Sequence, residues 1–199
     1  MNPINRFCAF FAASWFGDDL LSVHTVLNNE YKISGVERNL LCILRAAEDK
    51  RFFSHPGFDL LAIIRAFFMA VIYRRNSGAS TIDQQLVRSI TGRRERTITR
   101  KMREIVLATA INERYDKNSI AIAYMNIAYF GWKMEGVGKA LERLDKECLF
   151  PNEDIPYVLV SLLKYPLPRN PSFAVMARVR NRVVYIKRRL YSLGIELGR

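Results

Sequence analysis

The sequence predicts a mostly α-helical protein with a single core. Apolar residues recur every three or four positions in several segments, which is the spacing of one helix face. Turns rich in Gly, Pro, Asn and Ser separate these segments, and no segment alternates apolar and polar residues as a half-buried strand does. The chain has 199 residues, of which 50% are hydrophobic and 25% charged, so it is long enough to bury a core of its own.

Residues 1–35 are predicted to form an N-terminal arm, and residues 36–199 a single domain. The arm contains an apolar stretch, Cys8–Phe16, that follows one basic residue, Arg6. This pattern is only weakly typical of a signal peptide, because two acidic residues follow the apolar stretch at once. A helix that lies on a membrane and a helix that packs in the core both agree with the arm at least as well.

Two helices are predicted on either side of a polar turn. The first covers Glu37–Asp49, so Glu48 lies at its C-terminal end. Asp59 can cap the second, which runs to about Tyr73. This second helix holds the longest apolar run of the chain, but Arg65 interrupts the run, which is shorter than the roughly 20 residues that cross a bilayer. The sequence therefore contains no convincing transmembrane anchor.

Five further helices are predicted. Thr81 and Gln84 have the spacing of a capping box, which opens the first of them. A Gly-containing loop at 131–138 and a Pro-rich segment at 165–171 interrupt the helical pattern further on. The remaining predicted helices cover residues 96–113, 118–130, 151–163 and 174–193.

The charge of the chain indicates an anionic partner. Lys and Arg number 31 against 19 Asp and Glu, which gives a net charge of +12. Nucleic acid, an anionic lipid surface and a phosphorylated substrate all satisfy that charge. The three cysteines are far apart and form no CxxC pattern, and there are two histidines. A disulfide framework, a zinc site and a multi-histidine metal site are therefore not predicted.

The segment from Glu48 to Asp59 combines ionisable and aromatic residues. Glu48, Asp49, His55 and Asp59 fall within 12 residues of an aromatic-rich stretch. Apolar surroundings raise the pKa of a carboxyl group, which is one way to make a general base or acid. A helix end followed by a turn explains the same residues without any chemistry.

A row of basic residues follows between Arg88 and Arg103. The positions Arg96, Arg100 and Glu104 are four apart, so we expect them on one helix face. Guanidinium groups beside one carboxylate suit a pyrophosphate, because the carboxylate can orient an arginine or hold a divalent cation. The alternative is a solvated charged face whose ion pairs contribute little to stability.

Two further groups of polar residues are candidates for binding. The segment Gly78–Leu86 presents hydroxyls and amides at a helix start, where backbone N–H groups also point outward. Asn126 is a polar residue within an apolar helix, so it is either a satisfied core amide or part of a site. A well-capped helix alone would account for the first group.

Five stretches in this order resemble the family 51 glycosyltransferases, the peptidoglycan polymerases that join lipid-linked disaccharide units. The resemblance covers roughly residues 36–190. The matching stretches are Glu48-Asp49-x-x-Phe52-x-x-His55-x-Gly57-x-Asp59, Gly78-x-Ser80-Thr81-Ile82-x-Gln84-Gln85-Leu86, Arg100-Lys101-x-x-Glu104, Lys117-x-x-Ile120-x-x-x-Tyr124-x-Asn126-x-x-Tyr129-Phe130-Gly131 and Pro168-Arg169-Asn170-Pro171.

The resemblance implies a lysozyme-like α-helical glycosyltransferase fold with a small apolar lobe that faces the membrane. It implies inverting transfer from a polyprenyl-pyrophosphate glycan donor to the 4-hydroxyl of a lipid-linked disaccharide-peptide acceptor. The expected partners are this precursor, the growing glycan strand and an anionic membrane surface, and nucleic acid is not among them. The expected place is the extracytoplasmic face of the bacterial plasma membrane, to which the protein would bind peripherally.

The resemblance also implies roles for individual residues. Glu48 matches the general base, and Glu104 matches the second catalytic carboxylate, which supports the departing pyrophosphate, with Mg²⁺ or Mn²⁺ as a candidate ligand. No organic cofactor is expected. Asp49 and His55 are expected to orient the first motif. The full expected substrate-binding set is Asp49, Phe52, His55, Ser80, Thr81, Gln84, Gln85, Arg88, Arg96, Arg100, Lys101 and Asn126.

Departures from the family pattern keep two alternatives open. Ser89 stands where the family commonly has an Asn, and no convincing anchor precedes the domain. One alternative is a degenerate member that binds lipid-linked precursor without polymerising it. The other is a lysozyme-like hydrolase that uses Glu48 as general acid, which leaves the basic row without a role. The basic residues of the last helix, Arg178, Arg180, Arg182, Lys187, Arg188 and Arg189, suit either solvent or anionic headgroups.

Overall fold

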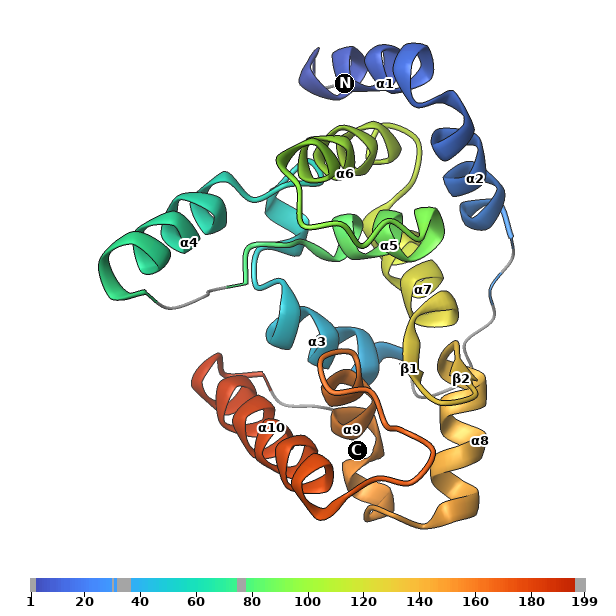
Figure 1. Ribbon diagram of the computed structural model, residues 1–199, viewed down its shortest axis with the longest axis vertical. Coiled ribbons are helices and arrows are strands. Elements are labelled where there is room, and N and C mark those ends of the chain that lie inside the picture. The colour runs from blue at the N-terminus through green and yellow to red at the C-terminus, as the bar shows by residue number, and fades with distance from the viewer. Residues whose placement is uncertain (1–2, 30, 32–36, 75–77, 196–199) are drawn as a thin grey trace. The chain divides into compact units, whose positions relative to one another are not determined.

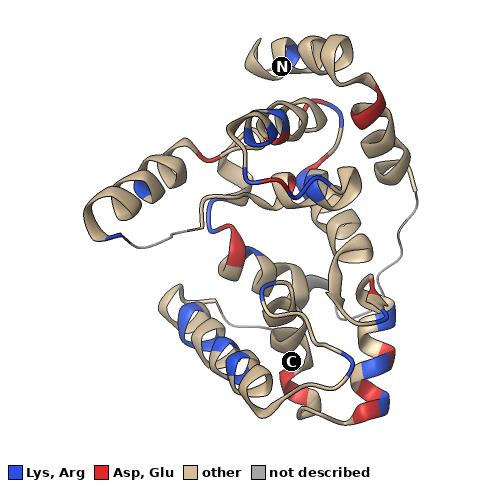
Figure 2. Cartoon of the chain, viewed as in Figure 1, with Lys and Arg blue, Asp and Glu red and all other residues tan. Residues whose placement is uncertain are grey.

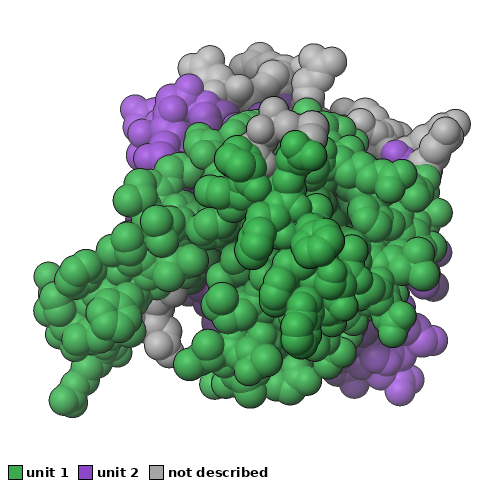
Figure 3. Space-filling model, turned by 90° about the horizontal axis from the view of Figure 1, so that it is seen from above, with its two compact units in different colours: residues 1–30, 51–121 green, residues 31–50, 122–199 purple. Residues whose placement is uncertain are grey.

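The computed structural model describes residues 3–29, 31, 37–74 and 78–195, and most of them are helical. The prediction of a mostly α fold is confirmed. The chain divides into two compact units, residues 1–30 with 51–121 and residues 31–50 with 122–199 (Figure 3). Each unit is described below by itself. The predicted division into an arm of residues 1–35 and a domain of residues 36–199 stays a prediction.

The first unit is a group of helices around α6 (Figure 1). Helix α1 packs along α6, α5 packs on the same helix, and α2 packs on α5. Buried aliphatic side chains such as Leu86, Leu107 and Ile111 fill the interior. The elements of this unit are α1 (Pro3–Trp15), α2 (Gly17–Leu27), the 3-10 turn η1 (Phe52–Ser54), α4 (Leu60–Tyr73), α5 (Ile82–Thr91), α6 (Ile98–Ile111) and the start of α7 (Lys117–Ile127).

Helix α4 begins as predicted and extends away from the other helices of its unit (Figure 1). The Asp59 side chain caps it by accepting a hydrogen bond of 2.9 Å from the backbone N–H of Ala62. Arg51 holds the same carboxylate through Nε, at 2.9 Å from Oδ2. Burial raises the pKa of Asp59, but the Ala62 N–H and the Arg51 guanidinium outweigh it and leave the pKa below its ordinary value. Most of the apolar side chains of α4 are exposed.

The starts of α5 and α6 are set by two threonine caps. Thr81 accepts from the backbone N–H of Gln84, and Thr97 from that of Arg100. Because Thr97 caps α6, the helix begins at Ile98 rather than at residue 96. The expectation that Arg96 shares a helix face with Arg100 is therefore wrong, since Arg96 precedes the helix and is exposed.

The second unit packs α3 against α9 and α10, which also contact each other. Leu40, Leu44, Leu159 and Ile186 are among its buried residues. Its elements are α3 (Glu37–Glu48), the end of α7, β1 (Tyr129–Gly131), β2 (Met134–Glu135), α8 (Val137–Glu147), the 3-10 turn η2 (Asn152–Asp154), α9 (Ile155–Leu162) and α10 (Phe173–Ser192).

A small hairpin occupies the segment that we expected to be a loop. Strands β1 and β2 pair antiparallel, although no alternating pattern predicts them. Gly131 has a φ of 143°, and a Cβ built there would lie 2.2 Å from the backbone oxygen of Leu167. Only glycine fits such a close approach, so the hairpin rests on backbone contacts that hydrophobic periodicity does not report. Among the described residues, no helix is long and apolar enough to span a bilayer.

Candidate functional site

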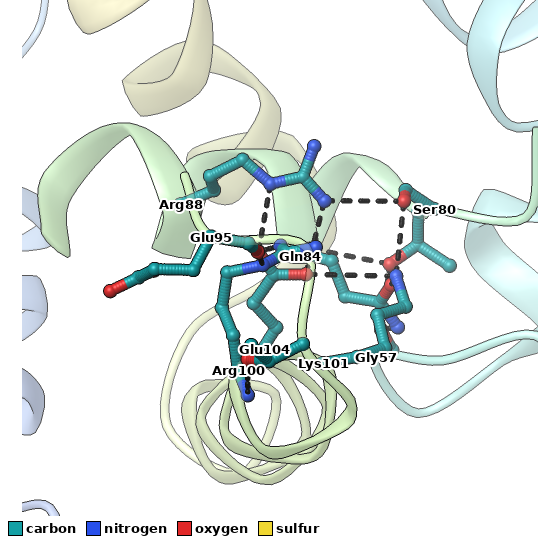
Figure 4. A network of polar contacts seen from close by, with 10 residues as sticks. Gly57, Ser80, Gln84, Arg88, Glu95, Arg100, Lys101 and Glu104 are labelled. Carbon is teal, nitrogen blue, oxygen red and sulfur yellow. Dashed lines mark hydrogen bonds and ion pairs between the residues drawn. The ribbon is translucent and has the colours of Figure 1, made fainter. Parts of the chain in front are cut away.

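The first unit contains a buried carboxylate surrounded by cations (Figure 4). Glu104 is 2% exposed. Arg88 donates to both of its oxygens, from Nε to Oε1 at 2.7 Å and from Nη2 to Oε2 at 3.0 Å. Arg100 also donates to Oε1, and the Nζ of Lys101 lies 3.6 Å from Oε2. We call Arg88, Arg100, Lys101 and Glu104 the cation cluster.

The helices bring this cluster together through simple periodicity. Gln84 and Arg88 are one turn apart on α5, and Arg100 and Glu104 are one turn apart on α6. Since α5 packs on α6, the two faces meet. Ser80, just before α5, accepts from Arg88 Nη2 at 3.3 Å and from Lys101 Nζ at 3.0 Å. Lys101 also donates to the Gln84 side chain.

The electrostatics of the cluster favour an anion. Burial raises the pKa of Glu104, but hydrogen bonds and charge from Arg88, with the charges of Lys101 and Arg100, leave the pKa below its ordinary value. Burial lowers the pKa of Lys101, and the Arg88 and Arg100 charges lower it further, against the opposing effect of Glu104. Three cations and one carboxylate leave a net positive charge of two. A pyrophosphate is a ligand that such a charge can hold.

The same geometry does not fit a divalent cation on Glu104. Arginine hydrogens engage both carboxylate oxygens, and the ammonium of Lys101 lies beside Oε2. A metal ion would have to displace these cations or share their side of the carboxylate, where the repulsion between like charges is large. The contacts of the cluster therefore favour a negatively charged ligand over Mg²⁺ or Mn²⁺.

A turn at Gly57 is hydrogen-bonded to the start of α5, next to the cation cluster. Gly57 has a φ of 105°, and a Cβ there would lie 2.4 Å from the backbone oxygen of Ala108. The Gly57 carbonyl accepts from the Thr81 hydroxyl at 2.7 Å and from Gln84 Nε2 at 3.5 Å. The backbone N–H of Gly57 donates to His55 Nδ1 at 3.2 Å. His55, Thr81 and Gln84 are all buried, so they fix the turn and the start of α5.

The second carboxylate singled out by the sequence, Glu48, lies in the second unit. It is the last residue of α3, and its side chain is 17% exposed. Arg182 of α10 donates from Nη2 to Glu48 Oε1 at 2.9 Å. The Arg182 guanidinium also lies 5.0 Å from the ring centre of Tyr185. Arg189 donates to the backbone oxygen of Ala46, so two arginines tie α10 to the end of α3.

The basic residues of α10 therefore do not form one solvent-facing stripe. Figure 2 shows them spaced along the helix. Arg182 and Arg189 donate hydrogen bonds to the end of α3, and Lys187 pairs with Asp154. This corrects the expectation that the whole set faces solvent or headgroups, because only Arg178, Arg180 and Arg188 remain as exposed arginines of that set.

The other expected site residues are placed as follows. Asp49 is buried directly after α3, and Asn126 on α7 is half-buried and donates to the Ile122 carbonyl at 3.0 Å. Phe52 is fully buried, with Lys117 Nζ 4.7 Å from its ring centre, so it packs inside the first unit. Gln85 is half-buried on α5, and Arg96 is exposed outside the cluster. The structure thus joins Ser80, Gln84, Arg88, Arg100, Lys101 and Glu104 in one network.

Sequence reasoning missed two sets of ionic contacts. In the first unit, Asp19 of α2 accepts from Arg103 Nη1 at 2.9 Å and lies 3.6 Å from Arg93 Nε. Asp83 is fully buried and pairs with Lys117 at 2.9 Å. Like the pair of Glu48 and Arg182, these contacts join residues far apart in the chain, and no local sequence spacing predicts them.

Comparison with known proteins identifies the family. The sequence model of the transglycosylase family matches residues 21–190. A Cupriavidus necator protein named as a candidate transglycosylase is 34% identical over 171 residues, which are 81% of this chain and 70% of that protein. The penicillin-binding protein 1A of Haemophilus influenzae is 36% identical over 163 residues, and that of Escherichia coli 37% over 151 residues.

The chain belongs to the transglycosylase family. It spans about a fifth of the length of the penicillin-binding proteins 1A, since the matched region is 19% of the Haemophilus protein and 17% of the Escherichia protein. In this chain, the matched region covers 80% and 73% of the residues, respectively. Residues 21–190, which the family model matches, include both carboxylates and the complete cation cluster.

Proposed function

We propose that the chain is a peptidoglycan glycosyltransferase that joins lipid-linked disaccharide units. The observation that carries this proposal is the cation cluster, in which Arg88, Arg100 and Lys101 exceed the charge of the buried Glu104. A donor activated by a polyprenyl pyrophosphate needs such a group of fixed cations. Membership in the transglycosylase family supports the same reaction class.

The cluster would hold the pyrophosphate of the donor. Negative charge grows on the pyrophosphate as its bond to the anomeric carbon breaks, and cations already in place stabilise that charge without reorganising. Glu104 would keep the two guanidinium groups in position, because it holds Arg88 through both nitrogens of a fork. In this assignment Glu104 orients cations and holds no metal ion.

Glu48 would be the general base. A sugar hydroxyl is a poor nucleophile at neutral pH, so its proton must pass to a base as it attacks. The acceptor's 4-oxygen forms a bond to the anomeric carbon of the donor, and the bond from that carbon to the pyrophosphate oxygen breaks on the opposite face. The proton goes to Glu48, and the electron pair leaves with the lipid pyrophosphate. Arg182 would position the Glu48 carboxylate for this step.

The remaining motif residues would shape the binding surfaces. Asp49, Gln85, Arg96 and Asn126 are assigned to substrate contact or to the support of such contacts. The exposed apolar side chains of α4, among them Phe67 and Phe68, would meet the membrane in which the lipid chains of donor and acceptor lie. In this proposal the protein would act peripherally at the extracytoplasmic face of the plasma membrane, beside the precursor and the growing strand.

Polymerisation of a labelled lipid-linked disaccharide pentapeptide by the purified protein in detergent tests the proposal. We expect a ladder of glycan products from the wild type and a rate about 10²- to 10⁴-fold lower from Glu48→Gln. Glu153→Gln, which alters an exposed carboxylate of the second unit, is the matched control and should retain the wild-type rate. Parallel assays with Mg²⁺, Mn²⁺ and a chelator show whether a divalent cation contributes.

Two results would contradict the proposal. Near-native polymerisation by Glu48→Gln would remove the base assignment. Precursor binding by the wild type without any product, in every metal and detergent condition, would establish instead a family member that binds the precursor and does not polymerise it.

A further inference from the structure

The second unit contains a cavity of about 480 Å³ beside the β hairpin. Its lining includes one aromatic ring and four cations, namely Trp132, Lys133, Lys139, Arg143 and Lys146. A cavity of a few hundred Å³ in which an aromatic side chain and several charged groups converge is the usual form of a ligand site. We call this cavity the tryptophan pocket.

Arg143 holds the walls of the pocket together. Its side chain is only 10% exposed. Nη1 donates to the backbone oxygen of Trp132 at 3.1 Å, and Nη2 donates to those of Pro168 and Arg169 at 3.1 and 3.2 Å. The backbone N–H of Trp132 also donates to the Leu167 oxygen at 2.8 Å. Hydrogen bonds therefore join the hairpin turn, α8 and the Pro-rich segment, so the pocket is formed before any ligand binds.

Three cations surround the indole of Trp132. Lys133 Nζ lies 4.8 Å from the ring centre, and the guanidinium carbons of Arg169 and Arg143 lie at 5.1 and 5.7 Å. These are cation–π distances. Lys133 has a φ of 58°, a conformation that is uncommon for residues other than glycine and that is found more often at binding sites. Trp132 nevertheless stays 37% exposed, so part of its ring is open to a ligand.

Helix α8 presents a row of cations to the pocket. Lys139, Arg143 and Lys146 are four and three positions apart, so they lie on one face of the helix. Glu142 and Glu147 also line the pocket, and Figure 2 shows the two signs of charge along this helix. Glu147 pairs with Arg143, whereas neither Lys139 nor Lys146 has a carboxylate partner in the described part of the chain. The unpaired charge of the row is therefore positive and lies at its two ends.

We propose that the tryptophan pocket binds an extended acidic segment of a partner protein. One carboxylate would meet Lys139 and another Lys146, with an apolar side chain between them against Trp132. The two lysines are seven positions apart, which is about 10 Å along a helix. A single carboxylate or phosphate group is too small to contact both ammonium groups. The partner must therefore carry at least two separate negative charges.

An extended peptide meets this requirement with ordinary geometry. In an extended chain, side chains four positions apart point to the same face and lie about 13 Å apart. The flexible stems of two lysines can cover the difference from 10 Å. The side chain halfway between the two carboxylates points to the same face, so it can contact the indole. Tryptophan and arginine are also the residues that contribute most often to binding at protein interfaces.

Other anions fit the pocket less well. Apart from Trp132, every residue that lines it is charged, so a bilayer would find no apolar surface to receive. A nucleic acid strand carries a phosphate at every nucleotide, and some of these would fall beside Glu142 and Glu147. A peptide can place a neutral or basic residue at those points, which makes the charges complementary. The alternating charges of α8 thus favour a polypeptide.

Titration of the full-length protein with a defined peptide tests the proposal. The probe is an acetylated and amidated peptide with the central sequence Glu-Ser-Leu-Ser-Glu, and its control has Gln in place of both Glu. The chain contains two tryptophans, so Trp15→Phe leaves Trp132 as the single reporter, and Trp132→Phe leaves Trp15 as the matched control. We expect the acidic peptide to shift the emission of Trp132 and not that of Trp15. The shift should weaken as salt is added, because salt screens exposed charges.

Charge variants measure the contribution of α8 to peptide binding. Lys139→Gln with Lys146→Gln should weaken binding about fivefold, because two ion pairs with the peptide are lost. Arg180→Gln with Arg188→Gln removes the same charge from exposed positions of α10 and should change the affinity less than about twofold. Glu142→Gln should strengthen binding about twofold, because it removes a repelling carboxylate. Circular dichroism confirms that each variant keeps its helical content.

The proposal is overturned by any of three results. The first is an emission of Trp132 that does not respond to the acidic peptide, or that responds equally to the Gln control. The second is an unchanged affinity when Lys139 and Lys146 are both replaced. The third is tighter binding of a single-stranded oligonucleotide at the same residues, which would assign the pocket to nucleic acid. None of these residues belongs to the cation cluster, and polymerisation is measured separately, so the transferase proposal can fail or stand independently.

Discussion

The two carboxylates that the motifs single out lie in opposite electrostatic surroundings. Glu104 in the first unit is almost fully buried and is held by Arg88 and Arg100, with Lys101 beside it. Glu48 in the second unit has a side chain that is 17% exposed and accepts a hydrogen bond from Arg182. The first group of charges has an excess of two positive charges, whereas the pair of Glu48 and Arg182 is balanced.

This difference indicates that the two carboxylates have different roles in the proposed reaction. A carboxylate whose oxygens are both engaged by cations is a poor proton acceptor, and its pKa is held below the ordinary value. In the proposed function it would fix the cations that meet an anion. A partly exposed carboxylate in a balanced pair can meet a substrate hydroxyl and accept its proton. In the proposed function, two residues of the same chemical type would thus serve binding and proton transfer.

Removing the charge of Glu104 is expected to have the largest effect on stability. Glu104→Gln leaves Arg88, Arg100 and Lys101 without their shared anion, which should lower the free energy of unfolding by about 3 kcal/mol. The cost stays at the lower end of the range for buried pairs, because Arg88 and Lys101 reach solvent. Urea unfolding measures it.

The matched control for this variant is Glu147→Gln. It removes the partner of Arg143, and because the Glu147 side chain is 36% exposed, the effect should stay within about 0.5 kcal/mol. Equal losses of unfolding free energy in the two variants would mean that the ion pairs of the cluster contribute no more than surface ion pairs do.

Changing Arg182 should affect turnover rather than donor binding. Arg182→Met frees the Glu48 carboxylate to move, and a displaced general base should lower kcat about 10- to 100-fold, with the donor KM unchanged. Arg182→Lys should restore part of the loss, because it returns a positive charge near Oε1. Arg180→Met alters an exposed arginine on the same helix and should be neutral. A rise in KM without a fall in kcat would place Arg182 in donor binding instead.

The smallest expected effect is a change in the pH dependence of stability, and it concerns Glu104. Since the pKa of Glu104 is lowered in the folded state, its contribution is fully present above its unfolded pKa, about 4.3, and is lost as the pH falls through the folded value. The difference in unfolding free energy between wild type and Glu104→Gln should therefore stay constant from pH 7 to about 5 and shrink below about pH 4. A difference that grew on acidification would contradict the assigned sign.

The local structure around the site was largely predictable from the sequence. The cap at Asp59, the cap at Thr81 and the helix that ends at Glu48 follow from residue types and spacing. The meeting of Arg100 and Glu104 follows from the four-residue period of a helix. These features are local, so a short segment contains all the information that they require.

The rest could not be predicted because it depends on contacts between distant segments. Arg182 lies 134 residues from Glu48, and Arg103 lies 84 residues from Asp19. The helix at Val137–Glu147 follows Gly136, whose backbone geometry and closeness to Asn126 set where the helix starts. We read the same glycines as a loop, since glycine spacing alone does not show which backbone it approaches.

Binding of a polyprenyl pyrophosphate to wild type, Glu48→Gln and Arg88→Ala tests most directly whether the cation cluster binds the anion while Glu48 acts in proton transfer. The ligand carries the anion without a transferable sugar, so binding is measured apart from chemistry. We predict that Glu48→Gln binds within about twofold of wild type, while Arg88→Ala binds about tenfold or more weakly, because it loses a charge-assisted hydrogen bond to the pyrophosphate. Wild-type affinity in Arg88→Ala together with a large loss in Glu48→Gln would contradict the account.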